Sequence, residues 1–181
     1  MEDPGLISVR TQVVLDTLVG SMAEAVTGRA GQPLEAPVEA ALAAIGDERR
    51  QALARAGYLT RALEVERFER ARAPMPWLSE RMERDRAGTA DWSAAAAALA
   101  TELAAAEPGR RPEPGDEGAV SWRVPGPGGH VRHYLALRAT GDGGDGGDGG
   151  PSADAKRAWL AGFLIHCIHE AVPPARSSEP T

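Results

Sequence analysis

The chain has 181 residues, of which 43% are apolar and 4% aromatic, so it is long enough for one domain with a sizeable core. Its 26 acidic residues outnumber its 20 basic residues, which gives a net charge of −6. This charge argues against nonspecific binding to nucleic acid and against attraction to anionic membranes.

The chain begins MEDPGLIS, without the basic and apolar regions of a secretory signal, so we expect a cytoplasmic protein. Its single cysteine, Cys167, excludes an internal disulfide framework. Lys156 is the only lysine, and the abundance of Ala, Gly, Pro and Arg indicates a GC-rich, bacterial-like coding sequence. We therefore give arginine clusters no weight as functional signals.

Residues 1–107 are interpreted as a helical region, because apolar residues recur in them at helical spacing. Pro37 lies in a first turn, Gly46 lies just past a helix end, and Asp47 is placed to cap the next helix. Five helices are predicted, over residues 6–27, 36–45, 48–72, 77–86 and 92–107.

The predicted helix after Asp47 bears on function in two ways. Gly57 is placed to divide it in two, at the turn of a helix-turn-helix DNA-binding motif, but Glu64, Glu66 and Glu69 would then oppose phosphate contacts. The mixed charges in ERRQ and EVERFERAR predict a solvated face with pairs three and four residues apart. The side chains expected to face inward are Leu53, Leu59, Leu63 and Phe68.

The sequence changes character after residue 107. Residues 108–118 have the composition of a Pro/Gly/charged linker, and the alternation of apolar and polar residues over 119–139 predicts a β-hairpin. The tract over 140–151 is a flexible linker, since it lacks the ligand spacing of a calcium-binding loop. The predicted fold is a single domain, mainly α: a bundle of about six helices with one β-hairpin inserted before the last helix.

That last helix is predicted over residues 152–173, with Ser152 as its N-cap and prolines at its end. One stripe of side chains should face the core, and a second face with two aromatic residues should also be covered. We therefore expect a helix that is buried on two sides, with Cys167 as an inert core residue. The core stripe consists of Leu160, Leu164, Cys167, Ile168 and Ala171; the second face carries Trp159, Gly162, Phe163, His166, His169 and Glu170.

The four histidines fall into two H-x-x-H pairs, His130 with His133 and His166 with His169. On a helix, His166, His169 and Glu170 project to one side, which is how helical metal sites collect imidazole and carboxylate ligands. If the hairpin forms, His133 faces inward and His130 lies exposed at its turn.

The candidate catalytic residues are therefore His133, His166, His169 and Glu170, and the same four are the candidate ligands of a divalent transition metal. They suit acid–base chemistry with or without a metal. The alternative is a solvated helix face, on which a histidine near the C-terminus is favourable through the helix dipole alone.

Three functions remain open on the sequence. The first is a small accessory or regulatory protein that acts through a protein partner or as a homo-oligomer, which the alanine-rich helices and the free hairpin edge favour. The second is a small enzyme with a histidine-centred site on the C-terminal helix. The third is a helix-turn-helix DNA-binding regulator, although Glu64, Glu66 and Glu69 argue against it.

Overall fold

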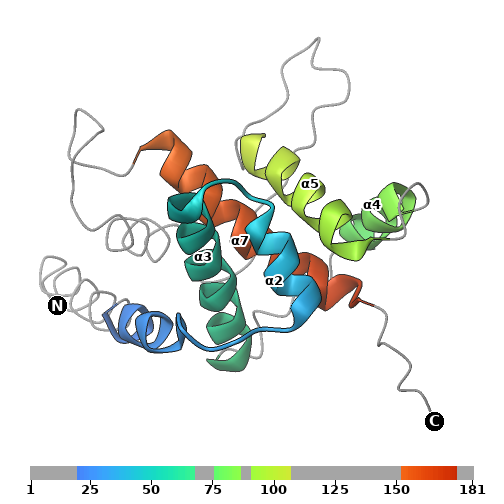
Figure 1. Cartoon of the computed structure of the whole chain (residues 1–181). Helices are drawn as coiled ribbons and strands as arrows, with labels where there is room; N and C mark the ends of the chain where they lie inside the picture. Colours follow the sequence, from blue (N-terminus) through green and yellow to red (C-terminus); the bar gives the residue numbers. More distant parts are fainter. Residues whose placement is uncertain (1–19, 68–75, 87–90, 107–151, 175–181) are drawn as a thin grey trace, which may run out of the picture.

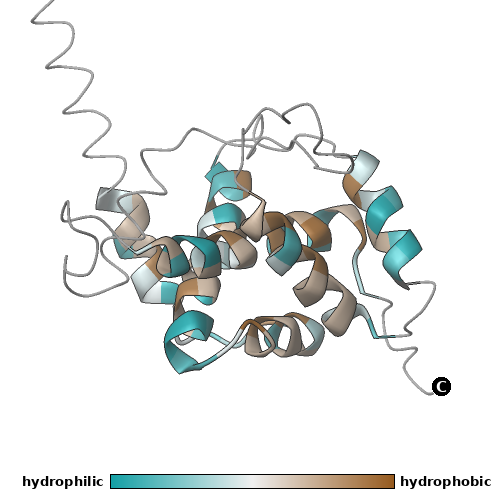
Figure 2. Ribbon diagram, turned by 90° about the horizontal axis from the view of Figure 1, so that it is seen from above, coloured by the Kyte–Doolittle hydropathy of each residue, from teal (hydrophilic) through white to brown (hydrophobic). Residues whose placement is uncertain are grey.

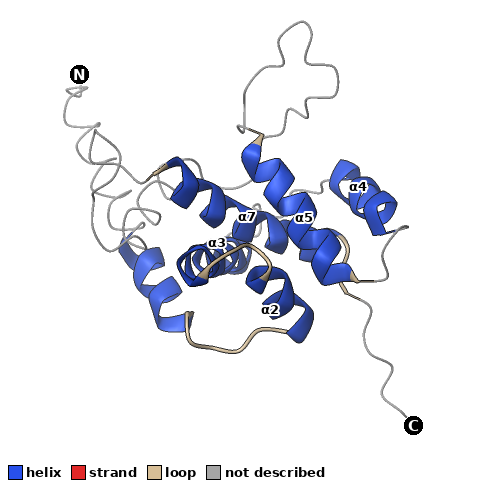
Figure 3. Cartoon of the chain, turned by 45° about the horizontal axis from the view of Figure 1, so that its top comes forward, coloured by secondary structure: helices blue, strands red, loops and turns tan. Residues whose placement is uncertain are grey.

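The computed structural model describes residues 20–67, 76–86, 91–106 and 152–174 (Figure 1). Residues 20–29 are helical, and five further helices follow; the described ranges contain no strand (Figure 3). These helices are α2 (Ala36–Ala43), α3 (Glu48–Arg67), α4 (Pro76–Arg86), α5 (Trp92–Ala105) and α7 (Ala153–Ala171). The mainly α prediction is confirmed. The hairpin predicted over 119–139 and both predicted linkers lie outside the described residues.

Helix starts follow the capping chemistry that the sequence indicates. The Asp47 carboxylate accepts a hydrogen bond from the Arg50 N–H at 2.9 Å, at the start of α3. The Ser152 hydroxyl accepts one from the Ala155 N–H at 3.2 Å and begins α7. Helix α2 ends earlier than predicted, and the chain then turns at Gly46, whose φ of 147° favours glycine.

Helix α7 lies at the centre of the bundle. Figure 1 shows α3 and α2 on one side of it and α5 and α4 on the other, and its largest interface is with α3. Side chains all around α7 are buried, so the expectation of a helix covered on two sides is confirmed. Apolar residues gather where the helices meet (Figure 2). No helix in the described ranges is long and apolar enough to cross a membrane.

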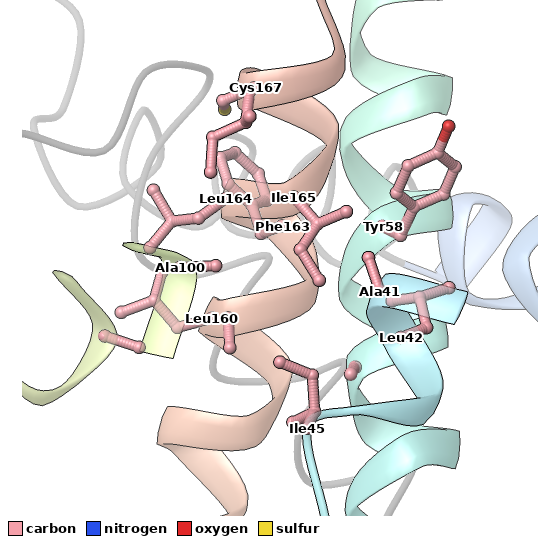
Figure 4. Close-up of a cluster of buried hydrophobic side chains, with 14 of the residues drawn as sticks. Ala41, Leu42, Ile45, Tyr58, Ala100, Leu160, Phe163, Leu164, Ile165 and Cys167 are labelled. Atoms are coloured by element: carbon pink, nitrogen blue, oxygen red, sulfur yellow. The ribbon is translucent and has the colours of Figure 1, made fainter. Parts of the chain in front are cut away.

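The two faces of α7 pack against different helices. Figure 4 shows Leu160 and Leu164 beside Ala100 of α5, while Ile165 lies on the side where Tyr58 of α3 approaches. Burying one such side chain contributes roughly 1.5–3 kcal/mol. The predicted stripe is buried except for its last member, Ala171, which is partly exposed.

Two glycines allow α3 and α7 to cross with their backbones in contact. A Cβ at Gly57 would lie 1.9 Å from the carbonyl oxygen of Trp159, and one at Gly162 would lie 1.7 Å from that of Ala54. Both distances are far below van der Waals contact, so only glycine fits at this crossing. Helix α3 runs unbroken through Gly57. The predicted division at Gly57 is therefore wrong, and the turn that a helix-turn-helix motif requires is not formed there.

We expect Gly162→Ala to lower the free energy of unfolding by at least about 3 kcal/mol, because the added methyl group forces two helix backbones apart. Urea denaturation followed by circular dichroism measures the change. Gly28→Ala is the matched control, since a Cβ there meets nothing within 4 Å and should change stability by less than about 1 kcal/mol. Equal effects of the two substitutions would contradict the close crossing.

Candidate functional site

The C-terminal half of α7 brings three of the four candidate residues together. His166, His169 and Glu170 lie where α7 meets α3, and the rings of the two histidines have centroids 6.3 Å apart. The fourth candidate, His133, lies outside the described residues. The histidine side chains are partly buried, so these residues are not a fully solvated helix face.

His166 faces a carboxylate on its own helix. Its Nδ1 lies 3.4 Å from Glu170 Oε2, which is long for a hydrogen bond, but Nδ1 is buried and has no closer partner among the described residues. Arg61 reaches the same carboxylate oxygen from α3, with Nε and Nη2 each at 3.2 Å. The Glu170 carboxylate therefore lies between an imidazole and a guanidinium.

Arg61 and Glu64 are buried charged residues of α3, with 1% and 2% of their surface exposed. Their side chains approach to 3.5 Å, and the Arg61 guanidinium also lies 5.7 Å from the centre of the Phe163 ring. The solvated face predicted for this helix is therefore wrong at Glu64, and Arg61 was not among the candidate residues. Their spacing of four and seven from Gly57 places both on the face that packs against α7. An interior glycine marks such a face, and this signal was available in the sequence.

A second chain of polar groups surrounds His169. Its Nδ1 lies 2.9 Å from the hydroxyl oxygen of Tyr58, and its Nε2 lies 3.7 Å from Glu35 Oε2. Glu35 is the N-cap residue of α2, and its side chain makes no capping hydrogen bond. Trp92 of α5 meets the His169 ring edge-on at 5.8 Å, and its indole N–H donates to the Val172 carbonyl at 2.6 Å. His169 thus connects α2, α3 and α5 with α7.

The surroundings shift the pKa values of these groups in different directions. Burial raises the pKa of the Tyr58 hydroxyl to about 12, with smaller contributions from the charges of Glu35 and Glu170. Burial lowers the pKa of His169, and Glu35 opposes this effect only in part. Burial alone would raise the pKa of Glu170, but the interactions with His166 and Arg61 together outweigh it and lower that pKa. At neutral pH Tyr58 is therefore protonated, His169 neutral and Glu170 ionised.

The arrangement provides two imidazoles, each with a carboxylate near one nitrogen. Within the described parts of the chain, no three His, Cys, Asp or Glu side chains are placed to hold a metal ion. A metal site that also uses His133 stays a prediction. What the described residues can do themselves is accept, hold or donate protons.

Comparison of the chain with models of protein families, with curated proteins and with solved structures finds no match. Any functional assignment therefore depends on the chemistry of the residues described above.

We expect Glu170→Gln to lower the free energy of unfolding at neutral pH by about 1 kcal/mol, because it removes a partly exposed carboxylate that contacts the buried Arg61. The pKa of Glu170 lies below its ordinary value of 4.5, so its contribution is present above that pH and is lost as pH falls through the lowered value. Urea denaturation across the acid range should show the difference between parent and variant shrinking below that pH. Glu83→Gln, at an exposed position of α4, is the control.

We expect the Cys167 thiol to be unreactive in the folded protein. It is buried, and burial raises its pKa to about 12, so almost no thiolate forms near neutral pH. A thiol-specific chromogenic disulfide reagent should modify one thiol per chain in denaturant and almost none without it. Rapid modification of the native protein would contradict the buried position.

Proposed function

We propose that this chain is a small helical enzyme in which Nε2 of His166 transfers a proton to and from a bound substrate. The observation that carries the proposal is the sequence of contacts from His166 Nδ1 to Glu170, at 3.4 Å, and from Glu170 to Arg61, at 3.2 Å. A histidine oriented by a carboxylate, which is itself held by a further group, is the usual arrangement of a general base.

The charges favour one protonation pattern at His166. A neutral imidazole carries a single N–H, and an ionised carboxylate beside Nδ1 favours the proton on that nitrogen. The lone pair is then on Nε2. When Nε2 accepts a proton, the Glu170 carboxylate stabilises the resulting imidazolium, and Arg61 keeps Glu170 ionised.

Solvent access is consistent with this role. His166 exposes 12% of its side chain, although its Nδ1 is buried, so the exposed surface belongs to other atoms of the side chain. The reaction class is proton transfer, as in isomerisation next to a carbonyl group or attack of water on an activated acyl group.

The described surface favours this function over binding to a protein partner. Among the described residues, every Leu, Ile, Met, Phe, Val, Trp and Tyr is buried or partly buried, and the fully exposed apolar residues are Ala and Pro. Partner interfaces are built around larger aromatic and aliphatic anchors. Action through a protein partner is the second candidate, and it would use polar groups here or residues outside the described ranges.

Carbethoxylation by diethyl pyrocarbonate tests the proposal, because this reagent attacks an unprotonated imidazole nitrogen. His169 exposes 20% of its side chain against 12% for His166, so exposure alone predicts that His169 reacts faster. We expect the reverse order at neutral pH, by about 10-fold, because both nitrogens of His169 face polar partners, whereas Nε2 of His166 has none among the described residues. Peptide mapping by mass spectrometry measures both rates.

Hydrolysis of p-nitrophenyl acetate provides the matching activity probe. We expect His166→Ala to lower the rate by about 100-fold, in the range typical for loss of a general base. His130→Ala is the control, since it removes a histidine that the proposal does not use. Faster carbethoxylation of His169, together with ester hydrolysis that does not depend on His166, would contradict the proposal. Action through a protein partner would then be the favoured function.

A further inference from the structure

We infer that His169 is a positioning residue that fixes the Tyr58 ring against the His166 imidazole. The two histidines are held in opposite tautomers. The inference rests on the proposed function for the role of His166. It separates two histidines that sequence spacing alone treats as equivalent.

The partners of His169 determine where its proton lies. The Glu35 carboxylate, 3.7 Å from Nε2, can only accept, so it favours the proton on Nε2. Tyr58 has its own proton to donate, and its oxygen lies 2.9 Å from Nδ1. The Tyr58 O–H therefore donates to Nδ1, and Nε2–H points toward Glu35. The reverse tautomer would direct the Nε2 lone pair at a carboxylate and leave the buried Tyr58 proton without this acceptor.

His166 has the opposite arrangement. Its carboxylate, Glu170, lies beside Nδ1 and favours the proton on that nitrogen. The two imidazoles are thus protonated on different nitrogens, although they are three residues apart on one helix. Both nitrogens of His169 face a polar partner, Tyr58 or Glu35, whereas among the described residues only Nδ1 of His166 does.

The ring contacts give His169 its positioning role. The Tyr58 ring lies 4.8 Å from the His166 ring and 6.3 Å from the His169 ring, measured between centroids. Trp92 contacts the His169 ring edge-on from α5 and restricts its rotation. With its hydroxyl held by His169, the Tyr58 ring packs beside the His166 imidazole.

Nuclear magnetic resonance of the full-length, isotope-labelled protein tests the tautomers directly. Long-range proton–nitrogen correlation at neutral pH should show His166 protonated on Nδ1 and His169 protonated on Nε2, with signals assigned from His166→Gln and His169→Gln. Tyr58→Phe should give His169 a mixture of tautomers and leave His166 unchanged, while Glu83→Gln alters neither. The same tautomer at both histidines, or no response of His169 to Tyr58→Phe, would overturn the inference.

A kinetic measurement tests the positioning role separately from the proposed function. In a folded His169→Ala variant, and in Tyr58→Phe as a second variant, the rate of carbethoxylation of His166 should differ several-fold from that of the parent, because the Tyr58 ring is no longer fixed beside it. An unchanged His166 rate in both would overturn the positioning role, even if the tautomers are as expected. If the tautomers and the positioning effect hold but ester hydrolysis does not depend on His166, then only the proposed enzymatic function fails.

Discussion

The contact between the α3 and α7 backbones at Gly57 and Gly162 determines most of the arrangement around it. Because neither position has a Cβ, a backbone carbonyl oxygen of each helix lies close to the glycine of the other. The two helix axes are therefore closer than larger residues would allow. Tyr58 and Arg61 follow Gly57 by one and four residues, while His166 follows Gly162 by four. The crossing therefore places the polar groups of both helices opposite one another, within about one turn of the glycines.

The buried charges next to this crossing have a cost that their mutual contacts offset. Removing a guanidinium or a carboxylate from water costs several kcal/mol, so an isolated Arg61 would not be stable in the core. Glu64 and Glu170 approach it from two helices, and Phe163 covers it. Glu170 also lies beside Nδ1 of His166, so one carboxylate contacts both the buried guanidinium and the imidazole. The packing of α3 on α7 and the electrostatics of His166 are thus consequences of the same set of residues.

The sequence predicted local features well and long-range features poorly. Caps at Asp47 and Ser152 and the apolar stripe of α7 depend on residues close in the chain, and the structure confirms them. The burial of Arg61 and Glu64 depends on a helix about 100 residues away, so charge patterning pointed to solvent instead. The candidate histidines were selected by spacing on one helix, and spacing gave no information on Tyr58 or Glu35 as their partners.

The same long separation affects how the chain reaches its fold. Tyr58 and His169 are 111 residues apart, and Arg61 and Glu170 are 109 apart, so the main helix interface joins segments far apart in the chain. Helical bundles fold fast when their contacts are local, and closing a loop of about 100 residues adds an entropic cost before any contact compensates for it. Despite its helical content, this chain therefore carries an entropic cost of the kind that slows folding. In the folded chain α7 lies between α3 and α5, so the surfaces of both helices that pack on it are covered only when the C-terminal segment is in place.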